Sequence, residues 1–188
     1  MTEKLKTPPT ELAVTIEDAR ANLRVDGADL DPLISLWVQG ITAMLEHEIG
    51  QKVMPQTWLW IDDAFPDAIR LPHPVRSVVV VKFRDDAGVE QTLDPADYVM
   101  DVQRYQSWLV PAVGKSWPAT FDQVNAVSVE VVCGMAANAA ELATVAPNVR
   151  TFILARLIET FDPASRPERD TIQSEFVNRL LDACRSYG

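Results

Sequence analysis

The side chains that could do chemistry are few, and their spacing does not match known active-site motifs. Gly114-Lys115-Ser116 resembles the end of a phosphate-binding loop, but the first glycine of that motif would fall on Leu109. His47-Glu48 resembles the start of a zinc-protease helix, but the second histidine would fall on Gln51. The sequence therefore argues against both a nucleotide-binding loop and a zinc-protease site.

A hydrolytic or metal site finds no better support. The chain has no Gly-x-Ser-x-Gly segment of the kind that presents a nucleophilic serine. Its two histidines, His47 and His73, are too few for a histidine-rich metal site, and His73 is predicted to lie in an exposed loop between prolines. Cys133 and Cys184 are predicted to be buried free thiols. We therefore expect no cofactor and no bound metal.

Two carboxylate pairs remain as possible acid/base groups. Asp62-Asp63 and Asp85-Asp86 both fall where the chain is expected to turn, which favours a role in turn hydrogen bonding. A carboxylate-dependent enzyme stays as a minor rival hypothesis. It requires a deep pocket that holds two acids with raised pKa values.

The overall charge limits the partners. Among 188 residues, 27 are acidic and 17 are basic, which gives a net charge of −10. Such a surface repels phosphate backbones, so general nucleic-acid binding is not expected. The acidity serves either solubility or a surface that must lie near DNA without binding it. We expect neither a membrane span nor a secretory signal, so the chain is predicted to work in water, in the cytoplasm.

Two helices are predicted in the first third of the chain. Thr15 can cap a short helix that ends near Leu23, and Asp29 or Asp31 can cap a longer one that ends at Gly50. At helical spacing, the apolar residues of the longer helix fall on one broad face: Leu30, Leu33, Ile34, Trp37, Val38, Ile41, Met44, Leu45 and Ile49.

The middle of the chain is predicted to be an antiparallel β lobe. Val127, Val129 and Val131 alternate with polar residues, which is typical of a half-buried strand. A hairpin turn is predicted at residues 85–88. The further strand candidates are residues 58–61, 75–84, 89–93, 98–102 and 108–110.

Two more helices are predicted after the lobe, one from Pro147 and a last one at about residues 168–186. The fold class is therefore α+β: a helical bundle of N- and C-terminal helices with an inserted antiparallel β lobe. The expected boundaries are an extended tail at 1–13, N-terminal helices at 14–54, the lobe at 55–135 and C-terminal helices at 136–188.

The helix from Pro147 is apolar on most sides, so it is either central in the bundle or in contact with a second partner. Glu48 falls on the apolar face of the longer N-terminal helix. It either reaches water at the helix end or pairs with an arginine such as Arg150 or Arg156. We take these three residues, with Phe152 and Ile158, as candidate subunit-interface residues.

The tryptophans offer a further contact. Trp117 lies in a proline-rich loop, where it either covers the lobe or contacts another chain. It is the sixth candidate interface residue. A rival hypothesis follows from it: a monomeric protein-binding module that uses the tryptophan-rich lobe, with Trp58 and Trp60 on one strand face.

A series of short segments now points to a family. In order they are residues 14–20 (Val-Thr-Ile-Glu-Asp-Ala-Arg), 23–26, Gly50 with Val53, 56–58, 69–72, 74–75, 77–78, 93–98 (Leu-Asp-Pro-Ala-Asp-Tyr), 109–111, 116–118, Val127, Val129 and Val131 with Gly134, 145–147 and 180–181. In this order the chain resembles the head–tail connector (adaptor, or head-completion) proteins of long-tailed bacteriophages and prophages.

The resemblance implies a structural role without catalysis. It implies a homo-oligomeric ring that docks on the portal protein, extends the DNA channel and supports tail-side completion proteins. DNA would pass through without specific binding, and no membrane would be involved. The implied location is the virion neck, with the host bacterial cytoplasm as the place of assembly.

Overall fold

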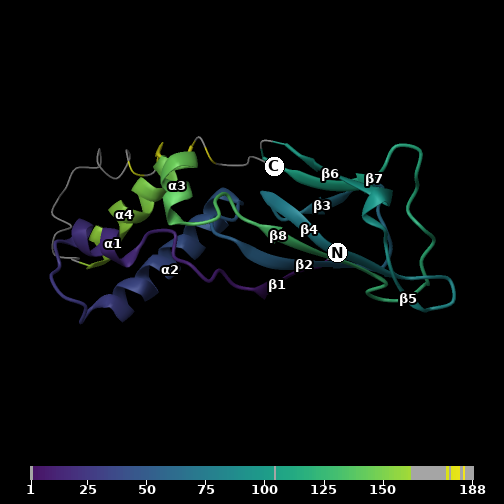
Figure 1. The fold of residues 1–188 in the computed structure, drawn as a ribbon, viewed down its shortest axis with the longest axis horizontal. Helices are drawn as coiled ribbons and strands as arrows, with labels where there is room; N and C mark the ends of the chain where they lie inside the picture. The colour runs from purple at the N-terminus through teal and green to yellow at the C-terminus, as the bar shows by residue number, and fades with distance from the viewer. Residues whose placement is uncertain (1, 104, 162–176, 178, 183, 185–188) are drawn as a thin grey trace. The chain divides into compact units, whose positions relative to one another are not determined.

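The computed structural model describes residues 2–103, 105–161, 177, 179–182 and 184, and it is an α+β structure, as predicted. The described chain forms two compact units (Figure 1). The β unit contains residues 2–9 and 55–134. The helical unit contains residues 10–54 and the residues from 135 onward. The chain therefore passes from one unit to the other three times.

The β unit is built from two antiparallel sheets. One has five strands in the order β1-β2-β8-β4-β5, and the other has three in the order β3-β7-β6. The strands are β1 (Thr2–Thr7), β2 (Gln56–Asp62), β3 (Ile69–Leu71), β4 (Val75–Arg84), β5 (Glu90–Thr92), β6 (Tyr98–Val102), β7 (Ser107–Pro111) and β8 (Val127–Cys133), with a 3-10 turn η1 (Pro95–Asp97) before β6.

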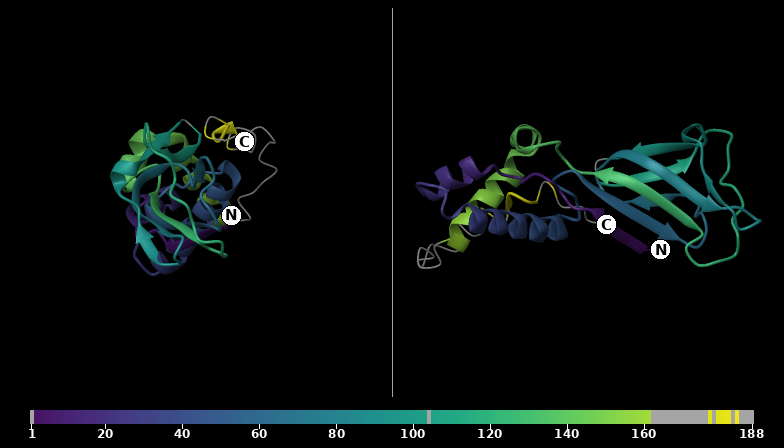
Figure 2. Two further views of the ribbon diagram at one scale, coloured as in Figure 1. Left: turned by 90° about the vertical axis from the view of Figure 1, so that its right-hand side faces the viewer. Right: turned by 60° about the horizontal axis from the view of Figure 1, so that its bottom comes forward.

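The two sheets share one apolar core. Strand β8 alternates between fully buried and half-buried residues along its whole length, which confirms the predicted half-buried strand. Its buried side chains join Trp60 and Val81 of the large sheet and Ile69 and Leu109 of the small one. The sheets therefore pack face to face as two layers, which Figure 2 shows.

Strand β1 is a feature that the sequence did not predict, since residues 1–13 were expected to be a tail. Thr2–Thr7 instead pairs antiparallel with β2, with Lys4 opposite Leu59. The Lys6 ammonium lies 2.6 Å from the Glu130 carboxylate on β8. All six residues of β1 are exposed, so the strand closes the sheet edge without adding to the core.

The predicted turn between β4 and β5 is confirmed. The Asp85 carboxylate accepts hydrogen bonds from the amides of Ala87 and Val89, both at 3.0 Å. Gly88 has a φ of 78°, a conformation that favours glycine. These hydrogen bonds, led by one from the Gln91 amide, hold the pKa of Asp85 below its usual value. The 85–86 pair is therefore part of a turn.

The helical unit is arranged around its last described helix. Its helices are α1 (Ile16–Leu23), α2 (Asp31–Ile49), α3 (Ala139–Val145) and α4 (Pro147–Phe161). Helix α4 contacts α1, α2 and α3, and Figure 2 shows it crossing α2. Val149, Phe152, Ile153 and Leu157 of α4 are fully buried in the core. The nearly all-round apolar character of this helix is thus largely explained within one chain.

The helix ends follow the sequence with one exception. Thr15 caps α1 by accepting a hydrogen bond from the Asp18 amide at 3.1 Å, and Gly50 ends α2 with a φ of 68°. The expected aspartate cap of α2 is wrong, because Leu30 is the N-cap residue and makes no side-chain cap bond. Asp31 instead lies in the first turn, 3.4 Å from Arg20.

Helix α3 and strand β3 were also not predicted. Helix α3 has a local signal, since Asn138 caps it by accepting from the Glu141 amide at 2.8 Å, and Glu141 accepts from the Ala137 amide. The predicted last helix at 168–186 lies mostly outside the described residues. Its described members Val177 and Leu181 are buried in the core of the helical unit.

Deletion of residues 1–7 tests the pairing of β1. Because β2 lies between β1 and β8, about half of its amides point toward β1. We expect hydrogen exchange of a peptide covering β2 to accelerate for about that fraction of its amides. A peptide covering β8 serves as the control and should keep its protection. Unchanged exchange in β2 would show that β1 is not paired in solution.

Candidate functional site

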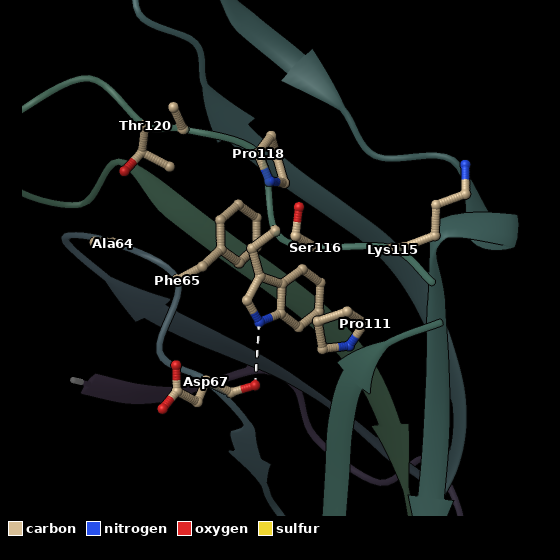
Figure 3. Close-up of a pocket in the computed structure, with 10 residues that line it drawn as sticks. Ala64, Phe65, Asp67, Pro111, Lys115, Ser116, Pro118 and Thr120 are labelled. Atoms are coloured by element: carbon tan, nitrogen blue, oxygen red, sulfur yellow. Dashed lines mark hydrogen bonds between the residues drawn. The ribbon is translucent and has the colours of Figure 1, made fainter. Parts of the chain in front are cut away.

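A pocket in the β unit is lined by the predicted interface residue Trp117 (Figure 3). Its volume is about 440 Å³. The Trp117 ring stacks on Phe65, with ring centres 4.7 Å apart and planes 7° from parallel. The indole nitrogen donates to the Asp67 carbonyl at 3.3 Å. Trp117 therefore covers the lobe and remains half-exposed at the pocket wall.

The charges at this pocket do not suit catalysis. Asp67 is the single carboxylate among the lining residues. The ammonium of Lys115 lies 2.9 Å from Asp97, and this hydrogen bond raises the pKa of Lys115. The pocket thus offers an aromatic wall with an already paired cation. Such a surface suits contact with another molecule better than proton transfer.

A buried histidine and serine form the arrangement most like a catalytic dyad. His73 Nδ1 lies 2.9 Å from Ser107 Oγ, which also accepts a hydrogen bond from the Val75 amide at 3.2 Å. Ser107 has no exposed surface and His73 is 8% exposed, so the expectation of an exposed His73 is wrong. A substrate cannot reach this serine. The pair instead satisfies polar groups between β4 and β7.

The remaining reactive groups are also placed in structural roles. Both cysteines are free, as predicted, and Cys133 is buried with its thiol 3.2 Å from the Pro72 carbonyl. Within the described residues, no group of three or more potential metal ligands comes together. Hydrogen bonds lower the pKa values of Asp18, Asp85 and Glu90. A general acid needs a shift in the opposite direction.

The predicted interface arginines are engaged within the helical unit. Arg150 of α4 lies 3.0 Å from Asp18 of α1. Arg156 donates to Glu159 at 2.7 Å and lies 5.1 Å above the ring of Phe152. Phe152 itself is fully buried and has no surface left for a neighbouring chain.

The other two predicted interface residues keep exposed surface. Glu48 lies on the exposed side of α2, near its end, and Ile158 is half-buried on α4. The structure therefore does not gather the six candidates at one site. It separates Trp117 in the β unit from the others in the helical unit.

Sequence reasoning missed which half of the apolar face of α2 stays exposed. Ile34, Val38, Ile41, Leu45 and Ile49 are buried. Leu30, Leu33 and Met44, which were predicted on the same face, are 37%, 40% and 50% exposed. The signal was present, because the apolar arc is wider than one packing surface needs.

Comparisons with known proteins place this architecture. No family model matches the chain, and no curated protein sequence matches it. A chain in the neck of an empty GTA particle, computed with C6 symmetry, matches with a TM-score of 0.80. The match covers 100% of this chain and 97% of that chain, at 17% identity. This chain shares its fold with a gene transfer agent neck chain.

Two further structures agree. A chain in the virion of a native gene transfer agent (GTA) particle matches with a TM-score of 0.78, and one in a native GTA neck computed with C12 symmetry matches with 0.76. Both share 17% identity and the same coverage. At this identity the likeness establishes the fold.

Among the described helices, none has the length and apolarity to span a bilayer.

The stack on Phe65 predicts the effect of changing Trp117. Trp117→Ala should lower the free energy of unfolding by about 2 kcal/mol, because Phe65 loses its aromatic partner and the buried area of the indole is lost. Trp117→Phe keeps a ring on Phe65 but removes the hydrogen bond to the Asp67 carbonyl, so the free energy of unfolding should fall by about 1 kcal/mol. Urea unfolding followed by circular dichroism measures both. An alanine variant as stable as the wild type would show that the stack does not form.

The ion pair between α1 and α4 predicts a pH dependence. The hydrogen bond from Arg150 lowers the pKa of Asp18, so the pair stabilises the fold above the unfolded aspartate pKa of about 3.9. This stabilisation is lost as the pH falls through the lower pKa of the folded state. Because Asp18 is half-exposed, Asp18→Asn should cost about 0.5–1 kcal/mol at pH 7.

The difference in thermal unfolding between this variant and the wild type should therefore be largest near pH 7 and shrink as the pH falls below about 3.9 toward the lower pKa of the folded state. The exposed Asp29 provides the control, since Asp29→Asn removes the same charge without that partner. A difference for Asp18→Asn that persists unchanged at pH 3 would contradict the ion-pair explanation.

Proposed function

We propose that this chain is a structural subunit of the neck of a phage-like particle, in a homo-oligomeric head–tail connector ring. The observation that carries the proposal is the match of the whole chain, both units included, to neck chains of a gene transfer agent particle. Those structures were computed with C6 and C12 symmetry. This shared fold supports ring formation by copies of this chain.

The charge of the chain supports a position beside DNA. A net charge of −10 keeps phosphate backbones from adhering, so DNA could slide past such subunits during packaging and ejection. In this proposal the ring docks on the portal protein, extends the DNA channel and carries tail-side completion proteins. It assembles in the cytoplasm of a bacterial host and remains in the virion neck of a phage or prophage particle.

The site chemistry supports a role without catalysis. Ser107 is buried away from solvent and Lys115 is paired with Asp97, so neither is poised for nucleophilic or acid/base work. A second candidate function rests on the Trp117 pocket, whose aromatic wall could hold a segment of another protein. In that case the chain would be a monomeric binding module.

Native mass spectrometry over a rising concentration series separates the two. A ring subunit should give a discrete closed oligomer whose copy number is a multiple of six, in line with the matched C6 and C12 necks. A binding module should remain a monomer. If the chain is monomeric alone, the cognate portal protein is added. A monomer that also fails to assemble on the portal would overturn the ring.

A further inference from the structure

Helix α2 carries an apolar surface that the other described residues leave exposed. At about 100° per residue, five residues share an arc of about 100° on the side away from the buried residues. Leu33, Leu36 and Met44 are 40%, 63% and 50% exposed, and Gly40 and Ala43 lie exposed between them. We call these five residues the exposed face of α2. Isolated exposed leucines are common, but a contiguous stripe along a helix indicates a contact surface.

The stretch that forms this face contains no charge. From residue 32 to residue 45 there is no Asp, Glu, Lys, Arg or His, although 23% of the chain is charged. A helix side exposed to water usually carries charged residues. Copies of a chain with a net charge of −10 repel one another, so they can meet at least cost where neither carries acids. The uncharged face therefore suits a second copy of this chain.

Gly40 gives an independent reason to expect a neighbour. Glycine inside a helix lowers helix stability relative to alanine or leucine. A Cβ added at Gly40 would meet no heavy atom within 4 Å, so the packing of this chain does not require glycine there. Small residues on a helix surface allow another element to approach closely. The weak helix former at position 40 is explained if a neighbouring subunit lies against it.

Other occupants fit this face less well. Residues 162–171 carry five charged side chains and, besides the prolines, one apolar side chain, Ala164, so their composition does not favour contact with three large apolar residues. The two edge strands of the five-stranded sheet are also guarded, because β1 carries Lys6 bound to Glu130 and β5 carries Glu90 bound to Lys82. Such charged edges discourage strand addition.

We infer that the exposed face of α2 is one half of the contact between neighbouring copies in the ring. This inference rests on the proposed function. In a closed ring the contact is heterologous, so the face meets a different surface of the next subunit. Leu33, Leu36 and Met44 supply the buried apolar area, and Gly40 and Ala43 set the closeness of approach.

Two substitutions test the face against matched controls. Gly40→Leu fills the point of close approach with a better helix former, and Leu36→Glu adds an acid at the centre of the face. Gln39→Leu is the control for the first, since it lies about 100° further around the same exposed helix. Val124→Glu is the control for the second, because Val124 is 72% exposed in a loop of the β unit.

Each variant is examined by native mass spectrometry for assembly, alone and with the portal protein, and by thermal unfolding under monomeric conditions. Gly40→Leu should raise the unfolding midpoint of the monomer by about 2–4 °C. It should also raise the concentration needed for assembly at least about tenfold. Leu36→Glu should block assembly without lowering the midpoint. Opposite effects on stability and assembly are not expected of a residue that only supports the fold.

The outcomes separate this inference from the proposed function. Rings formed normally by both variants would overturn the inference and leave the ring intact. Loss of assembly in Gln39→Leu or Val124→Glu as well would show that the effect is not specific to this face. Variants that form rings alone but fail only on the portal would assign the face to a different protein, against the inference. A wild type that never assembles would overturn the proposed function and the inference together.

Discussion

The burial of α4 is the constraint on which the helical unit depends. This helix is apolar on most of its circumference, and it can leave water only by packing against α1, α2 and α3 together. Two of these partners precede the long segment 55–134 of the β unit in the chain, and one follows it. The core therefore joins segments about a hundred residues apart, and their meeting requires the closure of a long loop. If the inserted segment 55–134 is already folded, it holds its two ends near each other. The entropy cost of closing the loop is then smaller than for an unfolded segment of the same length.

Local signals predicted the elements whose residues face one environment throughout. The alternation in β8, the turn at Asp85 and the cap at Thr15 each depend on neighbours in sequence, and each was confirmed. Elements that exist because of a distant partner were missed. Strand β1 has no buried residue to create a pattern, and the three residues of β3 are too few to show one. The burial of His73 depends on Ser107, which lies on another strand.

The candidate site shows the same division. Sequence composition singled out Trp117, and the structure gives it a ring partner and a pocket. Periodicity identified the apolar arc of α2 but could not separate its buried part from its exposed part. A helical projection shows which way each side chain points, but it does not show how many partners cover the apolar arc. Arg150 and Arg156 were considered as alternative partners of Glu48, and the structure places Arg150 beside Asp18 and Arg156 beside Glu159. Choosing among several acids requires knowledge of which helices are adjacent, and one sequence does not contain it.

The pairing of β1 has a mechanical consequence. Because Thr2–Thr7 belongs to the β unit while the next forty residues belong to the helical unit, the backbone crosses between the units near residues 9, 54 and 134. A pulling force between the units is therefore shared by three covalent tethers. The first of these holds only as long as the hydrogen bonds between β1 and β2 resist shear. If that strand separates from β2, the force passes to the two remaining tethers. The hydrogen bonds between β1 and β2 are therefore expected to break before either of the other connections is loaded alone.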